Sequence, residues 1–347
     1  MQFRYSRHLR RLASIAVILC IASACTTTPK NIDIYFIDVE GGQATLLVSP
    51  EGESLLIDAG YPGEGDDARD AKRIVVAATD AGVSRIDHLL ITHFHRDHFG
   101  GAAELMQLMP VSNFIDHDKP APEALVTPIA VEHFERYQQA RKAGIHVVPA
   151  VGDRLPLRGV EAVVVSTDGL TTATMEGAGT PNTACDRAVL AAVDAYENPR
   201  STGVLIEFGQ FRFLDVGDLS GQPLSDLVCP VDRIGPVDVY LVPHHGGADV
   251  ADPATLVAFR PRVAILNNGA EKGGEPAIFD FLRAADDLEA VWQLHRSEFE
   301  GAENFNDARI ANLDERTAHW IKLTAYRDGS FRIQNGRTGV WVDYKTP

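Results

Sequence analysis

Three histidines and one aspartate within six consecutive positions are the residues of this chain best suited to chemistry. They belong to the segment Ile-Thr-His-Phe-His-Arg-Asp-His-Phe-Gly-Gly at positions 91–101, which follows an apolar stretch. In a tight turn after a strand, His93 and His95 point to one side, while Asp97 and His98 project from the next bend. Imidazole and carboxylate groups bind Zn²⁺, Mn²⁺ and Fe, so this spacing predicts two adjacent metal positions. The alternative is a strand end at which Asp97 caps a helix and the histidines are solvated.

This segment resembles the hallmark of the metallo-β-lactamase-fold hydrolases, H-x-H-x-D-H-x-G-G at a strand end, and it matches completely from His93 to Gly101. Other pieces follow in the family's order. Leu56–Gly60 resembles its upstream Asp motif, Phe213–Asp218 resembles the motif whose last Asp bridges two metals, and Val242–Gly247 resembles its final His motif. The motifs Phe213–Asp218 and Val242–Gly247 would be weak evidence alone, but together with the His93–Gly101 segment they are strong evidence for the resemblance.

Within that superfamily, the closest resemblance is to proteins related to the competence-type DNA-uptake nuclease domain. Phe36–Ala44 approximates their opening D-V-G-Q-G-D-A, and His244–Gly246 matches their H-H-G. The resemblance runs from about Ile32 to at least Gly247. It implies an α/β fold of four layers, an αββα sandwich in which helices flank two mixed β-sheets.

The resemblance also implies a ligand set for two divalent metal ions. Its members are imidazoles and carboxylates: His93 and His95 on one ion, Asp97 and His98 on the other, Asp218 on both, and one of His244 and His245. The sequence does not choose between His244 and His245. Asp58 is expected to support the ligand loop rather than to bind metal. Asp97, as a ligand, and Asp58, as its support, are the predicted catalytic carboxylates. The ions are predicted to be Zn²⁺, with Mn²⁺ or Fe as alternatives, because the same ligands serve all three.

Three residues outside these motifs are candidates for the rim of the site. His117 follows a predicted strand and is either a ligand or substrate contact or an exposed histidine. His295 also ends a strand, where a hydrogen-bonded structural role is the alternative. Lys272 lies in a Gly-rich loop and either donates to the site or belongs to a simple turn.

The expected reaction is hydrolysis by a hydroxide that two metal ions activate. Two ions about 3.5–4 Å apart lower the pKa of a shared water to about 7, and the hydroxide attacks phosphorus or a carbonyl carbon. The resemblance favours a phosphodiester. The alternatives are a carboxylic ester, lactone or β-lactam hydrolase, and a metal-binding lipoprotein without catalysis.

The charge of the chain bears on its partners. The 347 residues include 32 basic and 48 acidic ones, for a formal net charge of −16. Nucleic-acid binding starts from a basic face that neutralises phosphates, so this charge disfavours long nucleic acids. The expected partner is therefore a small-molecule or envelope-associated substrate; no oligomeric state is indicated.

The first 24 residues have the composition of a secretory signal peptide. Four arginines precede the uncharged run Leu12–Ala24, whose 13 residues fall short of the roughly 20 that a membrane span needs. Cys25 follows Ala-Ser-Ala and resembles the lipidated cysteine of bacterial lipoproteins; ordinary cleavage to a soluble periplasmic protein is the alternative. We expect export to the periplasm or anchoring in the outer membrane, with residues 25–31 as a linker. Without residues 1–24, 28 basic residues remain against 48 acidic ones, a formal net charge of −20.

Residues 32–345 are predicted to form one α/β domain without internal repeats. Apolar runs predict strands over 32–37, 44–48, 54–57, 88–92, 111–115, 145–148, 162–166, 204–208, 211–216, 237–242 and 263–267, and a closing hairpin of 320–326 with 330–334. Helical patterns cover 68–81, 102–109 and 276–285, and a polar helix precedes Arg141. Cys185 and Cys229 either pair, as an oxidising compartment allows, or are small buried hydrophobes.

Overall fold

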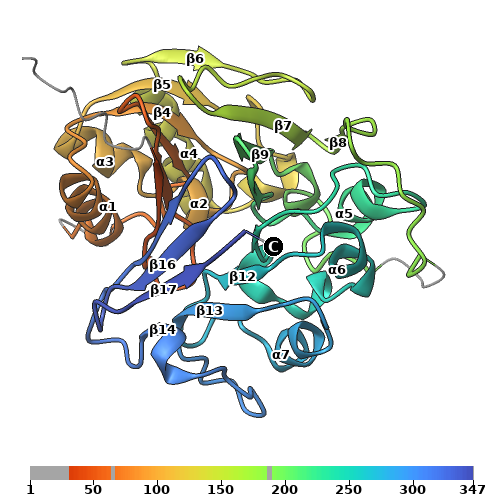
Figure 1. Cartoon of the computed structure of the whole chain (residues 1–347). Coiled ribbons are helices and arrows are strands. Elements are labelled where there is room, and N and C mark those ends of the chain that lie inside the picture. The colour runs from red at the N-terminus through yellow and green to blue at the C-terminus, as the bar shows by residue number, and fades with distance from the viewer. Residues whose placement is uncertain (1–30, 64–66, 186–189, 347) are drawn as a thin grey trace, which may run out of the picture.

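The computed structural model describes residues 31–63, 67–185 and 190–346. The predicted signal peptide, Cys25 and all of the linker except Asn31 lie outside these residues. Within them, no helix combines the length and the apolar composition that a membrane crossing requires. The described residues are built on two β-sheets with helices on the outer side of each (Figure 1).

The first sheet has nine strands, and both ends of the described chain contribute to it. Its order is β17 (Trp341–Tyr344), β16 (Phe331–Asn335), β15 (Ile321–Ala325), β1 (Ile32–Phe36), β2 (Thr45–Val48), β3 (Ser54–Ile57), β4 (Ile86–Leu90), β5 (Val111–Ile115) and β6 (Ile145–Val147). β1 pairs antiparallel with β2 and β15, whereas β3, β4 and β5 are parallel, so the sheet is mixed. β15 and β16 are the predicted closing hairpin, which joins the sheet beside β1.

The second sheet has eight strands. Its order is β14 (Ile310–Asn312), β13 (Ala290–His295), β12 (Val263–Leu266), β11 (Val239–Leu241), β10 (Phe211–Asp215), β9 (Gly203–Phe208), β7 (Glu161–Thr167) and β8 (Leu170–Thr171). β9 and β10 are antiparallel, whereas β10 to β14 run parallel to one another. Both sheets are therefore mixed, as predicted.

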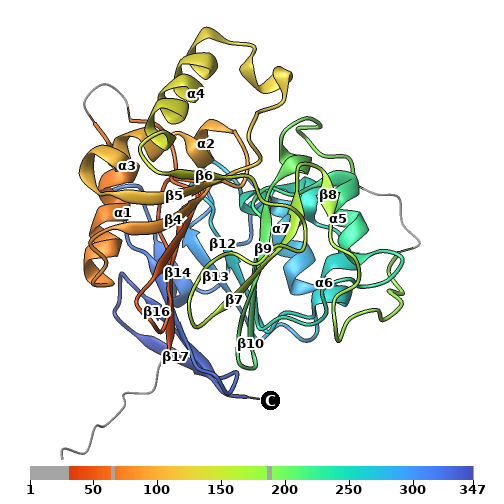
Figure 2. The same ribbon diagram turned by 90° about the horizontal axis from the view of Figure 1, so that it is seen from above.

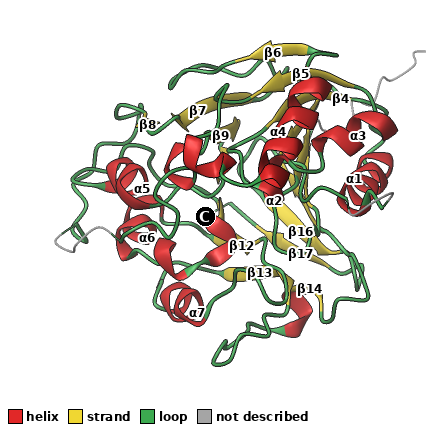
Figure 3. Ribbon diagram, turned by 180° about the vertical axis from the view of Figure 1, so that it is seen from behind, coloured by secondary structure: helices red, strands yellow, loops and turns green. Residues whose placement is uncertain are grey.

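Helices cover the outer face of each sheet, as Figures 2 and 3 show from two further sides. The first sheet packs against α1 (Arg69–Asp80), α3 (Ala102–Leu108) and α4 (Pro128–Arg141). The second packs against α5 (Gly221–Val228), α6 (Pro253–Phe259) and α7 (Pro276–Arg283). The predicted αββα sandwich is confirmed.

β1 shows why its sequence is apolar at nearly every position. Ile32, Ile34 and Phe36 face the core between the two sheets, while Tyr35 faces the core under α1. Side chains alternate across a strand, and both faces of this one are covered, so both must be apolar. The Phe36 ring meets that of Phe213 from the second sheet, with centroids 5.7 Å apart. This contact is part of the layer that holds the two sheets together.

The sequence did not predict α5 and α6. α5 begins at Gly221, which has a φ of 64°, and α6 has seven residues starting at Pro253. Two turns of helix are too short to show a clear apolar period. Both helices are stabilised by packing on the second sheet rather than by their own propensity.

Candidate metal centre

The predicted site residues lie where strands of both sheets end. On the first sheet, β3 leads to Asp58 and β4 leads to the turn that contains His93 and His98. On the second sheet, β10 leads to Asp218 and β11 leads to His245. β3 is parallel to β4, and β10 is parallel to β11, so the carboxyl ends of each pair meet at one edge.

After β4 the chain reverses direction through a single turn of helix, α2 (Arg96–Phe99). His95, which precedes α2, has an extended backbone (φ −81°, ψ 145°). The two glycines that follow are required by close packing. A Cβ at Gly100 would lie 2.2 Å from the Arg96 carbonyl oxygen, and one at Gly101 would lie 2.3 Å from the Ala59 carbonyl oxygen. The contact of Gly101 with Ala59 holds the histidine turn, residues 92–101, against the loop after β3.

The N-cap residue of α2 is His95, and Asp97 stands in the first turn of the helix. His93 and His98 are fully buried. The alternative reading, an aspartate that caps a helix beside solvated histidines, is therefore wrong.

Three groups of side chains among the described residues could hold a metal ion, and two of them share Asp218. The first of these two clusters consists of His93, His95 and Asp218. His93 Nε2 lies 3.0 Å from His95 Nδ1 and 3.7 Å from Asp218 Oδ2. All three ligand atoms lie within 4.8 Å of one another. Two imidazole nitrogens and one carboxylate oxygen thus converge on one point.

The second cluster consists of Asp97, His98, Asp218 and His245, all of them buried. Asp97 Oδ2 lies 3.3 Å from His98 Nε2 and 3.2 Å from His245 Nε2. Asp218 Oδ2 lies 3.1 Å and 3.4 Å from the same two nitrogens. Asp218 Oδ2 therefore belongs to both clusters.

Asp58 lies behind the second cluster. Its Oδ2 accepts hydrogen bonds from His98 Nδ1 and Thr92 Oγ1, each at 2.7 Å, and its Oδ1 accepts from the Thr92 amide at 2.7 Å. A carboxylate on the far nitrogen fixes the tautomer and ring orientation of a metal-binding histidine. Asp58 faces away from the cluster, so its part is to position His98.

The protonation states of the clustered side chains suit the binding of metal cations. Burial is the largest influence on His93, and together with the neighbouring imidazoles it holds the pKa of His93 well below its ordinary value, so this ring is neutral, as a metal ligand must be. Burial would raise the pKa of Asp97, but Lys272 and His98 hold it well below the usual range. Surrounding histidines do the same to the pKa of Asp218 against its burial.

The residues present fit two divalent metal ions. Asp218 Oδ1 and His245 Nδ1 are buried and have no hydrogen-bond partner among the described residues. Imidazole nitrogens that face each other at 3.0–3.2 Å require a shared proton or a common cation. Nitrogen and carboxylate donors suit Zn²⁺, Mn²⁺ and Fe alike, so the donor set leaves the metal open.

The structure separates His245 from His244. His245 belongs to the second cluster, whereas His244 Nδ1 lies 2.7 Å from Asp249 Oδ1 and its Nε2 lies 4.0 Å from Asp218 Oδ2. Both histidines have positive φ, 49° and 53°, which costs side-chain-bearing residues about 1–3 kcal/mol each. The geometry thus groups His245 with the other candidate ligands and leaves His244 at the edge of the site.

His117 and His295 belong to neither of the two clusters that share Asp218. His117 is buried with its Nε2 3.1 Å from Glu197 Oε1. His295 Nε2 lies 2.7 Å from Asp38 Oδ1, in a third group of possible ligands, Asp38, Glu40 and His295, whose two carboxylates pair with Arg73. Each buried imidazole thus lies beside a carboxylate outside the two clusters that share Asp218. Lys272, in contrast, reaches the second cluster, where its Nζ contacts Asp97 Oδ2.

Sequence reasoning missed one segment of the site, residues 190–202, which we call the carboxylate loop. Asp194 Oδ2 lies 3.5 Å from His95 Nε2, on the far side of the ring from His93. Glu197 accepts hydrogen bonds from the Phe94 amide at 3.0 Å and the Ala121 amide at 2.7 Å. The carboxylate loop thus orients the histidine turn from outside. The only signal in the sequence is a turn pattern, Asp194 ahead of Asn-Pro.

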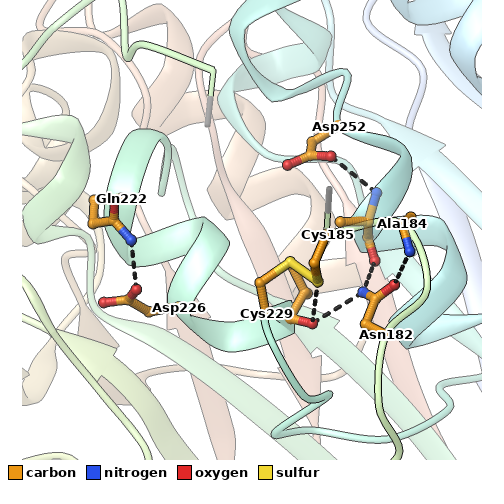
Figure 4. Close-up of a disulfide and its surroundings, with 9 residues drawn as sticks. Asn182, Ala184, Cys185, Gln222, Asp226, Cys229 and Asp252 are labelled. Carbon is orange, nitrogen blue, oxygen red and sulfur yellow. Dashed lines mark hydrogen bonds between the residues drawn. A yellow bond between two sulfur atoms is a disulfide. The ribbon is translucent and has the colours of Figure 1, made fainter. Parts of the chain in front are cut away.

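Cys185 and Cys229 form a disulfide (Figure 4). The bond joins the segment ahead of the carboxylate loop to the end of α5. Beside it, Asn182 Nδ2 donates to the Val228 and Ala254 carbonyl oxygens at 2.9 and 2.8 Å. Of the two alternatives for these cysteines, the structure shows the pair.

Part of the chain is similar in sequence to known proteins. Residues 37–172 match the family model described as metallo-beta-lactamase superfamily. Recombination protein 2 of Haemophilus influenzae is 23% identical over 233 residues, which are 67% of this chain and 24% of that protein. The match therefore spans about a quarter of that relative's length.

The chain is also similar to solved structures at low sequence identity. The metallo-beta-lactamase fold protein YhfI from Bacillus subtilis is 13% identical with a TM-score of 0.47, over 76% of this chain and 96% of that one. CmlA, a diiron β-hydroxylase from Streptomyces venezuelae, is 18% identical with a TM-score of 0.45, over 76% of this chain and 53% of that one.

Residues 37–172 therefore match a metallo-beta-lactamase superfamily domain. Members of that superfamily are typically hydrolases and bind two metal ions. The resemblance to the competence-related branch is confirmed by the match to Recombination protein 2.

Proposed function

We propose that this chain is an exported hydrolase that cleaves a phosphodiester with two divalent metal ions. The observation that carries the proposal is the position of one atom, Asp218 Oδ2. It lies 3.7 Å from His93 Nε2 in the first cluster and 3.1 Å from His98 Nε2 in the second. A carboxylate oxygen that belongs to both clusters suits a site for two cations. The residues that would hold the ions are His93 and His95 in one cluster, Asp97, His98 and His245 in the other, and Asp218 in both.

When bound, the two ions would supply Lewis-acid activation of water and of a substrate oxygen. The residues of the chain prepare the site for them. Asp58 turns His98 Nε2 toward the centre, and Asp194 lies against the outer nitrogen of His95. His93 stays neutral because it is buried among other imidazoles.

The substrate class rests on the resemblance and on charge. The competence-related branch favours a phosphodiester over an ester or a lactam. The formal net charge of −16, or −20 without residues 1–24, supports a small or envelope-associated phosphodiester over a long nucleic acid.

A substrate panel tests this proposal. Metal-loaded protein is offered bis(4-nitrophenyl) phosphate, an aryl ester, a lactone, a cephalosporin and single-stranded DNA. We expect turnover of the small phosphodiester, reduced at least about 100-fold by Asp97→Ala and unchanged by Asp226→Ala on α5. Turnover confined to the ester, lactone or cephalosporin would assign one of the alternatives. No turnover by fully metal-loaded protein would indicate a metal-binding protein without catalysis.

We also propose export with a lipid anchor on Cys25. The basic head and short apolar run of residues 1–24 support export, and so does the disulfide between Cys185 and Cys229, since such bonds persist in oxidising compartments. In a bacterial host, labelled palmitate should enter the full chain and should not enter the Cys25→Ser variant. Cytoplasmic retention of the unlabelled full chain would overturn both parts.

A further inference from the structure

The loop between β12 and α7 is fixed against the second metal position. The Gly274 amide donates to the His245 carbonyl oxygen at 2.9 Å, and the Glu275 amide donates to that of Gly246 at 3.0 Å. A Cβ at Gly273 would lie 2.2 Å from the His245 carbonyl oxygen, so the two backbones touch. The base of Lys272, next to these residues, has a set position beside the ligand His245.

The Lys272 side chain ends at the carboxylate that the second position needs. Its Nζ contacts Asp97 Oδ2, the same oxygen that lies 3.3 Å from His98 Nε2 and 3.2 Å from His245 Nε2. Nζ also lies 5.3 Å from the centroid of the Tyr61 ring, within the range of a cation–π contact. An ammonium group therefore binds the oxygen that a metal ion in the second cluster would bind.

The two metal positions differ in this respect. In the ion pairs of the described residues, Asp97 is the ligand carboxylate that pairs with a lysine, whereas Asp218 pairs with histidines. A divalent ion near an ammonium group is repelled, and the two compete for one carboxylate oxygen. The Lys272 side chain is 38% exposed, so its flexible stem can carry the ammonium group out to solvent.

We propose that Lys272 is a tethered cation that competes with the metal ion at Asp97, so that the two positions fill in order. The His93 and His95 position fills first. The position at Asp97, His98 and His245 fills at higher metal concentration, when Lys272 releases Asp97. At limiting metal the protein holds one ion, and the lysine supplies the second positive charge. This inference rests on the two-metal centre of the proposed function.

Metal titration of the metal-free full chain tests the inference without measuring activity. Co²⁺ is added stepwise, ligand-field absorption reports each position, and Zn²⁺ competition against a chelator gives two dissociation constants. We expect the second constant of the wild-type protein to be at least about tenfold weaker than the first. Lys272→Met and Lys272→Gln should each tighten the second constant about tenfold, equal to about 1.4 kcal/mol, and leave the first unchanged. Lys272→Arg, which keeps the positive charge, should leave the metal affinity of the second position as weak as in the wild-type protein.

Lys322→Met is the matched control, because Lys322 also lies over a tyrosine ring, 4.6 Å from the Tyr35 centroid, and beside the carboxylate of Asp33. It should bind metal as the wild-type protein does. Two equal constants in the wild-type protein, or a second constant that neither neutral variant changes, would overturn the role of Lys272 and leave the two-metal centre standing. Absence of bound metal in the wild-type protein and every variant would instead overturn the proposed function.

Discussion

The histidine turn and the carboxylate loop meet at the metal centre but are encoded differently. The histidine turn supplies four ligands from six neighbouring positions, and its chemistry is evident from spacing alone. In the carboxylate loop, Asp194 contacts His95 and Glu197 accepts a hydrogen bond from the Phe94 amide. These partners are about a hundred residues apart in the sequence. Thr202 at its end donates to the Thr92 carbonyl oxygen at 2.8 Å. Ligand identity is thus local in the sequence, whereas ligand orientation depends on tertiary contacts.

The largest effect should follow from removing the carboxylate that joins the two clusters. Asp218→Asn replaces the carboxylate that both clusters share with a neutral amide, so each of the two positions would lose a charged ligand atom. We expect metal content well below two equivalents and turnover reduced about 10³-fold or more. Metal analysis and steady-state kinetics measure this, with Asp226→Asn on α5 as the control. Two tightly bound ions in Asp218→Asn would show that the clusters do not share this residue.

The next largest effect should come from a residue that orients a metal ligand without binding metal itself. Asp58→Asn keeps all metal ligands but weakens the acceptor for His98 Nδ1. Loss of such a carboxylate typically costs about 10–100-fold in metal affinity. We expect that loss at the second position, with the first position changed much less. Stepwise metal titration measures it, and an equal loss at both positions would mean that Asp58 maintains the fold rather than His98.

The carboxylate loop should contribute less than Asp58, because Asp194 is 30% exposed and lies farther from its histidine. Asp194→Asn should weaken the first position about tenfold and spare the second, the reverse of Asp58→Asn. Asp280→Asn on the exposed face of α7 is the control. If Asp194→Asn left the metal affinity of the first position unchanged, the carboxylate loop would contribute packing but would not orient His95.

The same contrast explains what could be predicted from the sequence. The strands with two buried faces, such as β1, and the ligands His93 to His98 follow from patterns within ten residues. The choice of His245 over His244 requires the turn after β11, where both residues have positive φ. The partners of His117 and His295 come from Glu197 and Asp38, far away in the chain, and no spacing rule connects them.

The smallest effect concerns the pH dependence of stability. Glu197 is fully buried, which would raise the pKa of its carboxyl, but His117 and the Phe94 and Ala121 amides outweigh burial and lower it. A carboxyl with a lowered folded-state pKa stabilises the protein above its unfolded pKa, about 4.3, and loses that contribution as pH falls through the folded value. Glu197→Gln should therefore cost about 1 kcal/mol at pH 7 and flatten the decline in stability below about pH 4.3.

Urea unfolding from pH 7 to pH 3, with exposed Glu298→Gln as the control, measures this slope. An unchanged slope in Glu197→Gln would mean that the pKa of the Glu197 carboxyl is the same in the folded and the unfolded protein. The carboxylate loop would then hold the histidine turn by shape rather than by charge.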